Sequence, residues 1–222
     1  MGIQKTAIIL GATGLTGSLL LKRLIKDDRY INIKLFSRRA TEITSPKVNE
    51  YIVDLLNLEQ FKDQFTGDEV FCCIGTTTAK TSDKNLYRAI DFGIPSVAAK
   101  LAKENGIHTF MVVSAIGANI NSSIFYNKTK GEMEQDVLGQ AIQNTYILRP
   151  SLILGDRGEK RLGEKIASLF MKLTNPLIVG KFRKYRSIQA DCIAATMINL
   201  TQSGLDEQIL ESDIIQKLCS EK

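Results

Sequence analysis

Two side chains that can exchange a proton with a bound molecule, Tyr126 and Lys130, lie four residues apart. On a helix this spacing places both on one face, near enough to interact. A nearby ammonium lowers the pKa of a phenol, so that Tyr126 can act as acid or base near neutral pH. Ser114 ends an apolar run 12 residues earlier, where its hydroxyl can orient the same substrate oxygen. The alternative interpretation of the pair is an ordinary surface contact.

A glycine-rich segment, Gly11-Ala12-Thr13-Gly14-Leu15-Thr16-Gly17, follows the first apolar run. Gly11 permits a tight turn, Gly14 allows the backbone to approach a pyrophosphate, and Gly17 lets the next helix pack close to the sheet. The start of that helix offers N–H groups and a positive dipole end to phosphates. An ordinary turn is the alternative, but the apolar run before it and the amphipathic run after it favour dinucleotide binding.

The residues after the second apolar run indicate which dinucleotide. Proteins that bind NAD usually carry an acidic residue about 20 residues past the glycines, where it holds the ribose 2′-hydroxyl. This sequence has Ser37-Arg38-Arg39 there, and a guanidinium suits the 2′-phosphate of NADP(H). The sequence therefore predicts NADP(H) in preference to NAD(H), unless the arginines simply face solvent. Asp54, after the third run, is expected either to contact the adenine or to cap a helix.

These motifs need a scaffold of alternating strands and helices, which the hydrophobic pattern predicts. Short apolar runs indicate buried strands, and apolar residues at helical spacing indicate helices. A helix break is expected before Pro95, because proline disfavours helical backbone at the preceding residue. The alternation predicts an α/β fold with a three-layer, doubly wound parallel sheet, the Rossmann fold. The expected strands are 6–10, 31–36, 48–53, 69–74, 109–114 and 145–148, and the expected helices are 15–27, 58–65, 85–104 and 125–138.

Composition bounds the class of protein and its partners. The 222 residues are 44% hydrophobic and 24% charged, as in ordinary globular chains, and no linker or repeat divides them, so 1–222 should form one domain. The net charge of +5 is scattered apart from a basic cluster within 181–186, for which a solvated surface is the default interpretation. No run approaches the ~20 apolar residues of a membrane span. Neither nucleic acid nor a membrane is an expected partner.

The cysteines and the single histidine limit other chemistries. The four cysteines show no C-x-x-C spacing, so free buried thiols in a reducing compartment are expected, and with them a cytoplasmic location. His108 is the one histidine of the chain, which excludes a multi-histidine metal site. No metal is expected.

The two motifs resemble those of the short-chain dehydrogenase/reductases, and the G-x-x-G-x-x-G form resembles their extended and atypical branches. The resemblance is closer still to the atypical members related to the human Tat-interacting protein, an oxidoreductase-like tumour suppressor. The segments that carry this resemblance span most of the chain, and the run at 156–164 is more specific than a general cofactor fingerprint. They are GATGLTG at 11–17, FCCIGTT at 71–77, SAIGAN at 114–119, YNKTKGEME at 126–134 and LRPSLILGDRGEKRLGE at 148–164.

The resemblance implies roles for the matching residues. Tyr126 would be the proton-transfer residue, Lys130 would bind the nicotinamide ribose and tune Tyr126, and Ser114 would complete the catalytic group. The family commonly has glycine after the Arg-Pro of the sixth strand, whereas this chain has Ser151, which puts the backbone approach to the cofactor there in doubt. The residues expected to contact the cofactor are Gly11, Thr13, Gly14, Leu15, Thr16, Gly17, Ser37, Arg38, Arg39, Asp54, Cys73, Ile74, Gly75, Thr76, Lys130, Arg149, Pro150 and Ser151.

The segment 155–186 is expected to form a small helical or irregular substrate region that closes the cleft as a lid. It follows the sixth strand on the carboxyl side of the sheet, and glycines punctuate it. Arg157 and Arg161 are expected to meet an anionic substrate group, or else to pair with Glu159 and Glu164. A rigid helix–turn–helix packed on the sheet is the alternative to a lid. The small size of the region argues against nucleotide-sugar chemistry.

Together these features predict an NADP(H)-dependent oxidoreductase. Hydride would pass to or from a small carbonyl or alcohol, with Tyr126 as acid or base. The alternative is a regulatory or interaction protein that binds NADP(H) without significant turnover and changes a protein-binding surface with it. A small-molecule substrate is the expected partner in the first case and a protein in the second. A monomer or a homodimer is expected in both.

Overall fold

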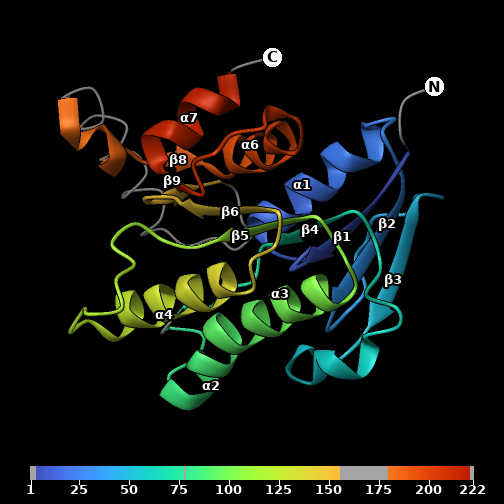
Figure 1. Cartoon of the computed structure of the whole chain (residues 1–222), viewed down its shortest axis with the longest axis horizontal. Coiled ribbons are helices and arrows are strands. Elements are labelled where there is room, and N and C mark those ends of the chain that lie inside the picture. The colour runs from blue at the N-terminus through green and yellow to red at the C-terminus, as the bar shows by residue number, and fades with distance from the viewer. Residues whose placement is uncertain (1–3, 78, 156–179, 221–222) are drawn as a thin grey trace.

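Seven parallel strands form the central sheet (Figure 1). The computed structural model describes residues 4–77, 79–155 and 180–220. The strand order β3-β2-β1-β4-β5-β6-β9 shows that the chain starts near the centre and winds outwards on both sides. A separate small sheet pairs β7 (Ile153–Leu154) with β8 (Ile188–Gln189). The strands of the central sheet are β1 (Lys5–Leu10), β2 (Tyr30–Ser37), β3 (Val48–Ile52), β4 (Glu69–Cys72), β5 (Thr109–Val113), β6 (Asn144–Arg149) and β9 (Ile209–Glu211).

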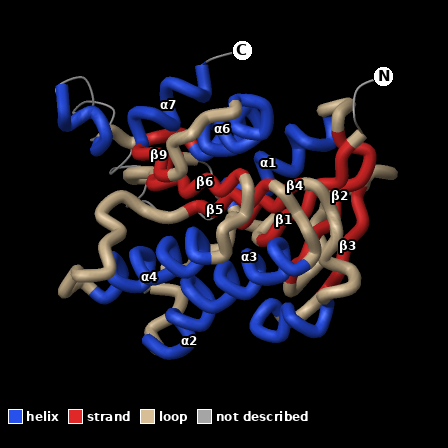
Figure 2. The backbone as a smooth tube through the Cα atoms, in the orientation of Figure 1, coloured by secondary structure: helices blue, strands red, loops and turns tan. Residues whose placement is uncertain are grey.

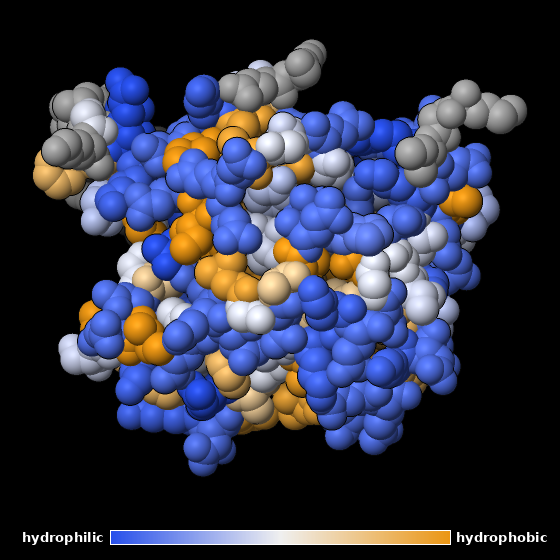
Figure 3. Space-filling view, viewed as in Figure 1, coloured by the Kyte–Doolittle hydropathy of each residue, from blue (hydrophilic) through white to orange (hydrophobic). Residues whose placement is uncertain are grey.

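Helices cover both faces of the sheet and complete three layers (Figures 1 and 2). Successive side chains of a strand point to opposite faces, so Ile9 of β1 enters one hydrophobic core and Ile8 enters the other. Figure 3 shows a mostly hydrophilic surface, with apolar side chains visible between the two helix layers and in smaller patches over them. The predicted three-layer α/β fold is confirmed. One face carries α1 (Leu15–Lys26), α6 (Ala190–Ser203) and α7 (Ser212–Ser220), and the other carries α2 (Lys84–Arg88), α3 (Ile94–Glu104) and α4 (Phe125–Gly139).

The predicted strands form within two residues of their expected ends, but the sheet has one strand more. Strand β9 is only three residues long, too short to show a pattern, and it pairs with β6 through Ile147 and Ile209. The helix expected at 58–65 is a 3₁₀ helix at Leu55–Phe61. Asp54 caps it by accepting a hydrogen bond from the backbone N–H of Leu56 at 3.1 Å.

The helix break expected before Pro95 takes the form of a π-helical turn, Ala89–Gly93, between α2 and α3. Proline has no N–H, and its ring crowds the carbonyl four residues earlier, which here belongs to Asp91. The N–H of Ile94 accordingly reaches back five residues, to the carbonyl of Ala89. The wider turn lets the helix pass a proline that would otherwise end it.

The structure corrects the prediction that all four cysteines are free. Cys192 of α6 and Cys219 of α7 form a disulfide with their Cα atoms 5.2 Å apart, whereas Cys72 and Cys73 are free thiols. The partners are 27 residues apart, and only the packing of α6 against α7 brings them together. Among the described helices, none combines the length and the apolar character needed to cross a membrane.

Candidate functional site

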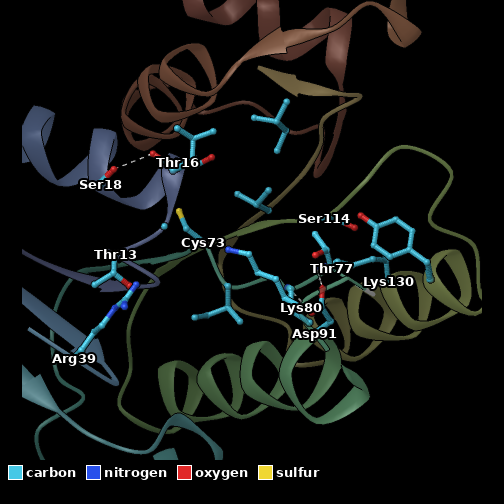
Figure 4. Close-up of a pocket in the computed structure, with 18 residues that line it drawn as sticks. Thr13, Thr16, Ser18, Arg39, Cys73, Thr77, Lys80, Asp91, Ser114 and Lys130 are labelled. Carbon is cyan, nitrogen blue, oxygen red and sulfur yellow. Dashed lines mark hydrogen bonds and ion pairs between the residues drawn. The ribbon is translucent and has the colours of Figure 1, made fainter. Parts of the chain in front are cut away.

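A cavity of about 420 Å³ lies at the carboxyl ends of β1, β4 and β5 (Figure 4). Ligands of open α/β sheets bind at this edge. The turn between β1 and α1 forms one wall, the segment after β4 forms the floor, and the end of β5 with the start of α4 forms the other wall. The cavity thus joins both sequence motifs. The lining residues are Thr13, Gly14, Leu15, Thr16, Ser18, Arg39, Cys73, Ile74, Gly75, Thr76, Thr77, Lys80, Asp91, Val113, Ser114, Tyr126, Lys130 and Ile153.

The glycine turn has the close packing that a dinucleotide site needs. Gly11 has a φ of +85°, and a side chain there would meet the carbonyl oxygen of Cys73 at 2.7 Å. A Cβ on Gly17 would lie 2.2 Å from the carbonyl oxygen of Gly11, so only glycine allows α1 to start this close to the sheet. Gly14 caps α1 without any side-chain hydrogen bond, which leaves the helix start open to an anion. These residues fit the pyrophosphate of NAD(P)H.

The residues predicted to select the cofactor separate in space. Arg39 is exposed and lines the cavity on the side of Thr13, as Figure 4 shows, whereas Arg38 is exposed but lies outside the lining. The Ser37 hydroxyl donates to the carbonyl of Arg39 at 2.8 Å and so fixes the backbone of this segment. Asp54 also lies outside the lining, where it caps the 3₁₀ helix.

Lys130 lines the cavity together with a carboxylate that the sequence did not single out, Asp91. The Lys130 Nζ lies 2.9 Å from the Asp91 Oδ1, with side-chain exposures of 4% and 1%. The contact has the distance of an ion pair without the alignment of a hydrogen bond. The other oxygen of Asp91, Oδ2, accepts the backbone N–H of Thr76 at 2.8 Å. Asp91 therefore joins the segment after β4 to α4.

Tyr126 lines the same cavity, and its hydroxyl has no hydrogen-bond partner among the described residues. Burial raises the pKa of Tyr126 above its ordinary value near 10, Lys130 opposes this, and Asp91 raises the pKa further. Lys130 was expected to lower the pKa, but burial outweighs it. Tyr126 is consequently protonated at neutral pH and can donate a proton into the cavity.

Ser114 belongs to a second buried polar group, with Glu134 and Arg149. The Ser114 hydroxyl donates to Glu134 Oε1 at 2.5 Å, and Arg149 Nε donates to the same oxygen at 2.9 Å. Arg149 Nη2 also donates to Glu134 Oε2, which completes a two-pronged ion pair. A hydroxyl has one proton, so Ser114 can only accept a hydrogen bond from a ligand in this state. Glu134 continues the helix face of Tyr126 and Lys130 at the same spacing.

The remaining predicted positions lie at varying distances from the cavity. Cys73, Ile74, Gly75 and Thr76 line it, and a Cβ on Gly75 would lie 3.6 Å from Asp91 Oδ1. The segment Arg149–Ser151 does not line it, because Arg149 binds Glu134 and the Ser151 hydroxyl donates to the carbonyl of Arg186.

Besides Asp91, sequence reasoning missed three further polar residues of the lining, Ser18, Thr77 and Lys80, which lie in or near the quoted segments but outside any motif position. Two predicted substrate residues, Arg157 and Arg161, lie outside the described residues, as does most of the predicted lid at 155–186. In the basic cluster, Lys184 pairs with Glu211 at 3.0 Å.

Comparisons with known proteins agree with this geometry. The family model described as NAD(P)H-binding matches residues 11–169. Protein FMP52, mitochondrial, of Candida albicans is 33% identical over 216 residues, which cover 95% of this chain and 93% of that protein. Protein HTATIP2 of Rattus norvegicus is 35% identical over 171 residues, which cover 75% of this chain and 70% of that protein.

Solved structures share the fold at low identity. A UDP-glucose 4-epimerase of Thermotoga maritima superposes with a TM-score of 0.70 at 15% identity and covers 97% of this chain and 82% of its own. A short-chain dehydrogenase/reductase superfamily protein of Agrobacterium tumefaciens, solved with bound NAD, reaches a TM-score of 0.71 at 12% identity, covering 92% of this chain and 76% of its own. Identities this low show the fold alone.

The names of the relatives also correct one expectation. The FMP52 proteins of Candida albicans and Debaryomyces hansenii are both named mitochondrial. The prediction of a cytoplasmic location was therefore wrong, and the disulfide between Cys192 and Cys219 removes the free-thiol argument on which it rested. The match over residues 11–169 and the identity to relatives over most of their length show that the chain belongs to the NAD(P)H-binding family, as an atypical short-chain dehydrogenase/reductase related to HTATIP2.

Proposed function

We propose that this chain is an oxidoreductase that uses NADPH to reduce a small carbonyl compound, or runs the reverse reaction, with Tyr126 as the proton-transfer residue. The observation that supports this most strongly is that one cavity is lined by both the glycine turn and the Tyr126–Lys130 face of α4. A protein that only sensed NADP(H) would not need an unbonded phenol at this position. The proposal accounts for both motifs with one site.

Each residue of the site would have a separate role in the proposed reduction. Bound NADPH would supply the hydride. Tyr126, protonated because burial raises its pKa, would donate its proton to the substrate oxygen. The Lys130 ammonium, on the same helix face, would stabilise the phenolate that remains. The Ser114 hydroxyl already donates its hydrogen bond to Glu134, so it would accept a hydrogen bond from the hydroxyl of the alcohol product.

The proposed preference for NADPH rests on Arg39 rather than on Arg38. Arg39 lines the cavity and has no ion pair among the described residues, so its guanidinium is available for a 2′-phosphate. A charge-assisted hydrogen bond contributes about 1.5–3 kcal/mol, or roughly 10- to 100-fold in affinity. Arg39→Ser should weaken NADPH binding by that factor and leave NADH binding unchanged. Arg38→Ser, the matched control, should alter neither. Calorimetric titration of both cofactors measures this, and an equal affinity of the unaltered chain for NADH would contradict the preference.

The test of the reaction is NADPH oxidation against a panel of aldehydes, ketones and quinones. Tyr126→Phe should lower turnover by about 100-fold or more, the usual contribution of a general acid. Tyr51→Phe is the matched control, because Tyr51 stacks on Phe36 away from the cavity. Turnover that survives Tyr126→Phe would refute the assigned role. Tight NADPH binding without oxidation of any substrate would instead support the regulatory alternative.

The names of the FMP52 relatives support a mitochondrial site for this reaction. We propose that the chain acts there. Immunodetection of the endogenous protein in fractionated cells tests this directly. Recovery outside the mitochondrial fraction would contradict it.

A further inference from the structure

The disulfide between Cys192 and Cys219 joins the last helix that the structure describes, α7, to α6. Cys192 lies in the first turn of α6, and Cys219 lies in the last turn of α7. One turn further along α6, the Thr196 hydroxyl donates to the carbonyl of Ile215 in α7 at 2.8 Å. Figure 1 shows the two helices side by side. Neither cysteine lines the cavity, so the proposed reaction does not use them.

Helix α7 buries little of itself. It is nine residues long, and its buried residues are Ser212 and Ile215. Ile214, Leu218 and Cys219 are only partly buried where they pack on the core. A helix this short is marginal by itself in water, so its order depends on what attaches it. The disulfide therefore constrains an element that packing alone holds weakly.

The amino end of α7 meets the segment that runs into β8. The Ser212 hydroxyl lies 3.1 Å from the Ser151 hydroxyl and 3.4 Å from the carbonyl oxygen of Arg186. Directly before the helix, Glu211 pairs with Lys184 at 3.0 Å. The two ends of α7 thus have different partners, the disulfide at the carboxyl end and the segment before β8 at the amino end.

This segment leads into the small sheet of β7 and β8, which forms part of the cavity wall. Ile188 of β8 donates its N–H to the carbonyl of Leu152 at 3.0 Å and pairs with Ile153 of β7. Ile153 lines the cavity. Both strands are only two residues long, and an isolated pair of strands is marginally stable at best. A continuous chain of contacts therefore runs from the disulfide through α7 to a residue of the cavity.

We infer that the disulfide is a redox-sensitive clasp. While it is intact, α7 holds the β7–β8 sheet in place at the cavity, and when a dithiol reduces it, α7 and this part of the wall loosen. The inference does not depend on the proposed reaction, because it concerns the order of the wall and the binding of a ligand.

The reduction is an ordinary thiol–disulfide exchange. Cys219 is half-buried and Cys192 is 9% exposed, so a thiolate of the dithiol attacks the Sγ of Cys219. The bond between the cysteines breaks, and Cys192 leaves as a thiolate that takes up a proton. The second thiol of the reductant then displaces Cys219, which is protonated in turn. The chain gains two electrons and two protons, and the reductant becomes a disulfide.

The first measurement is alkylation of the unfolded chain, purified without reductant and read by mass spectrometry. Cys72 and Cys73 should be labelled, whereas Cys192 and Cys219 should be labelled only after treatment with dithiothreitol. Labelling of Cys192 and Cys219 without dithiothreitol would overturn the inference.

The second measurement compares amide hydrogen exchange and NADPH affinity of the folded chain before and after reduction. Exchange in α7 and β8 should become about 10-fold faster or more, because disulfides commonly contribute more than that factor. Exchange in α4, on the other face of the sheet, should not change. NADPH affinity should fall by about 3-fold or more, since only molecules with an ordered wall bind fully. Unchanged exchange in β8, equal acceleration in α4 or an unchanged affinity would each overturn the clasp.

Three variants separate the clasp from other effects of the reductant. Cys219→Ser should resemble the reduced chain, and any further change on adding dithiothreitol would count against the inference. Ser212→Ala keeps the disulfide but removes the contact at the other end of α7, and should speed exchange in β8 without speeding it at the carboxyl end of α7. Ser220→Ala is the matched control, because its hydroxyl bonds to the carbonyl of Gln216 in the same helix, and it should change neither. Unaltered exchange of β8 in Ser212→Ala would overturn the coupling through α7.

Discussion

Two groups, each of a lysine, a carboxylate and a tyrosine, lie near opposite ends of β4. They differ in whether the tyrosine hydroxyl has a hydrogen-bond partner. At the amino end, Glu69 pairs with Lys5 and accepts the hydroxyl proton of Tyr30, each at 2.5 Å. At the carboxyl end, Asp91 pairs with Lys130, and the hydroxyl of Tyr126 has no partner among the described residues. The first group satisfies itself, and the second faces a cavity. The same three chemistries thus stabilise the fold at one end and leave a proton donor available at the other.

The largest difference between the two groups is expected when the lysine of each is replaced. Lys130→Met should cost about 3–5 kcal/mol in the free energy of unfolding, because it leaves a fully buried carboxylate without its counter-charge. Lys5→Met should cost less, since Lys5 is 26% exposed and Tyr30 still donates to Glu69. Urea unfolding of the two variants measures the difference. Equal losses would show that both pairs serve stability in the same way.

When the tyrosine hydroxyls are removed instead, the larger loss of stability should be at the Glu69 group. Tyr30→Phe leaves an oxygen of Glu69 unsatisfied and should cost about 1–3 kcal/mol of stability without changing NADPH binding. Tyr126→Phe breaks no hydrogen bond and should change stability by no more than about 0.5 kcal/mol. Urea unfolding and calorimetric titration of both variants provide the readouts. A large loss of stability in Tyr126→Phe would mean that its hydroxyl has a structural partner in solution.

Within the cavity, Ser114 can be compared with Tyr126 by its effect on turnover. The Ser114 hydroxyl donates its hydrogen bond to Glu134, so towards the substrate it can only accept one. Ser114→Ala therefore removes a hydrogen-bond acceptor, not a donor, from beside the substrate oxygen. Turnover should fall by no more than about 10-fold, the scale of one neutral hydrogen bond, and by less than in Tyr126→Phe. Steady-state rates with one accepted substrate decide this. Equal losses in the two variants would show that Ser114 donates to the substrate after all.

The smallest expected effect is a decline of stability at alkaline pH. Burial raises the pKa of both Tyr30 and Tyr126 in the folded chain above the value near 10 of an unfolded tyrosine. Above that pH the unfolded chain loses protons that the folded chain retains, so this contribution to stability is complete below about pH 10 and is lost as pH rises further. Unfolding midpoints against pH measure the decline. Tyr30→Phe should flatten it more than Tyr126→Phe, and the opposite order would contradict the assignment.

The sequence predicted the parts of the site that depend on short spacings. Gly11 to Gly17 and Tyr126 with Lys130 are local patterns, and strand–helix alternation placed them at one sheet edge. Asp91 and Glu134 escaped prediction because their roles depend on contacts across the fold: Asp91 is 39 residues from Lys130, and Glu134 is 20 from Ser114. The disulfide was missed for the same reason, and strand β9 because three residues are too few to show a pattern. Of the two adjacent arginines, the sequence favoured Arg38 for the 2′-phosphate, whereas the structure has Arg39 in the lining of the cavity.

The π-helical turn has a consequence for how the sequence can vary. One extra residue in a helical turn rotates everything beyond it by about 100° around the helix axis. Deleting a residue from Ala89–Gly93 would therefore leave the chain with a choice between two alignments. It could keep the apolar face of α3, including Ala98 and Ala102, against the sheet, or it could keep Asp91 against Lys130. Lineages that lost this residue would be expected to keep the buried face and give up the acid, so the length of this turn would be a marker of descent that residue identity alone does not provide.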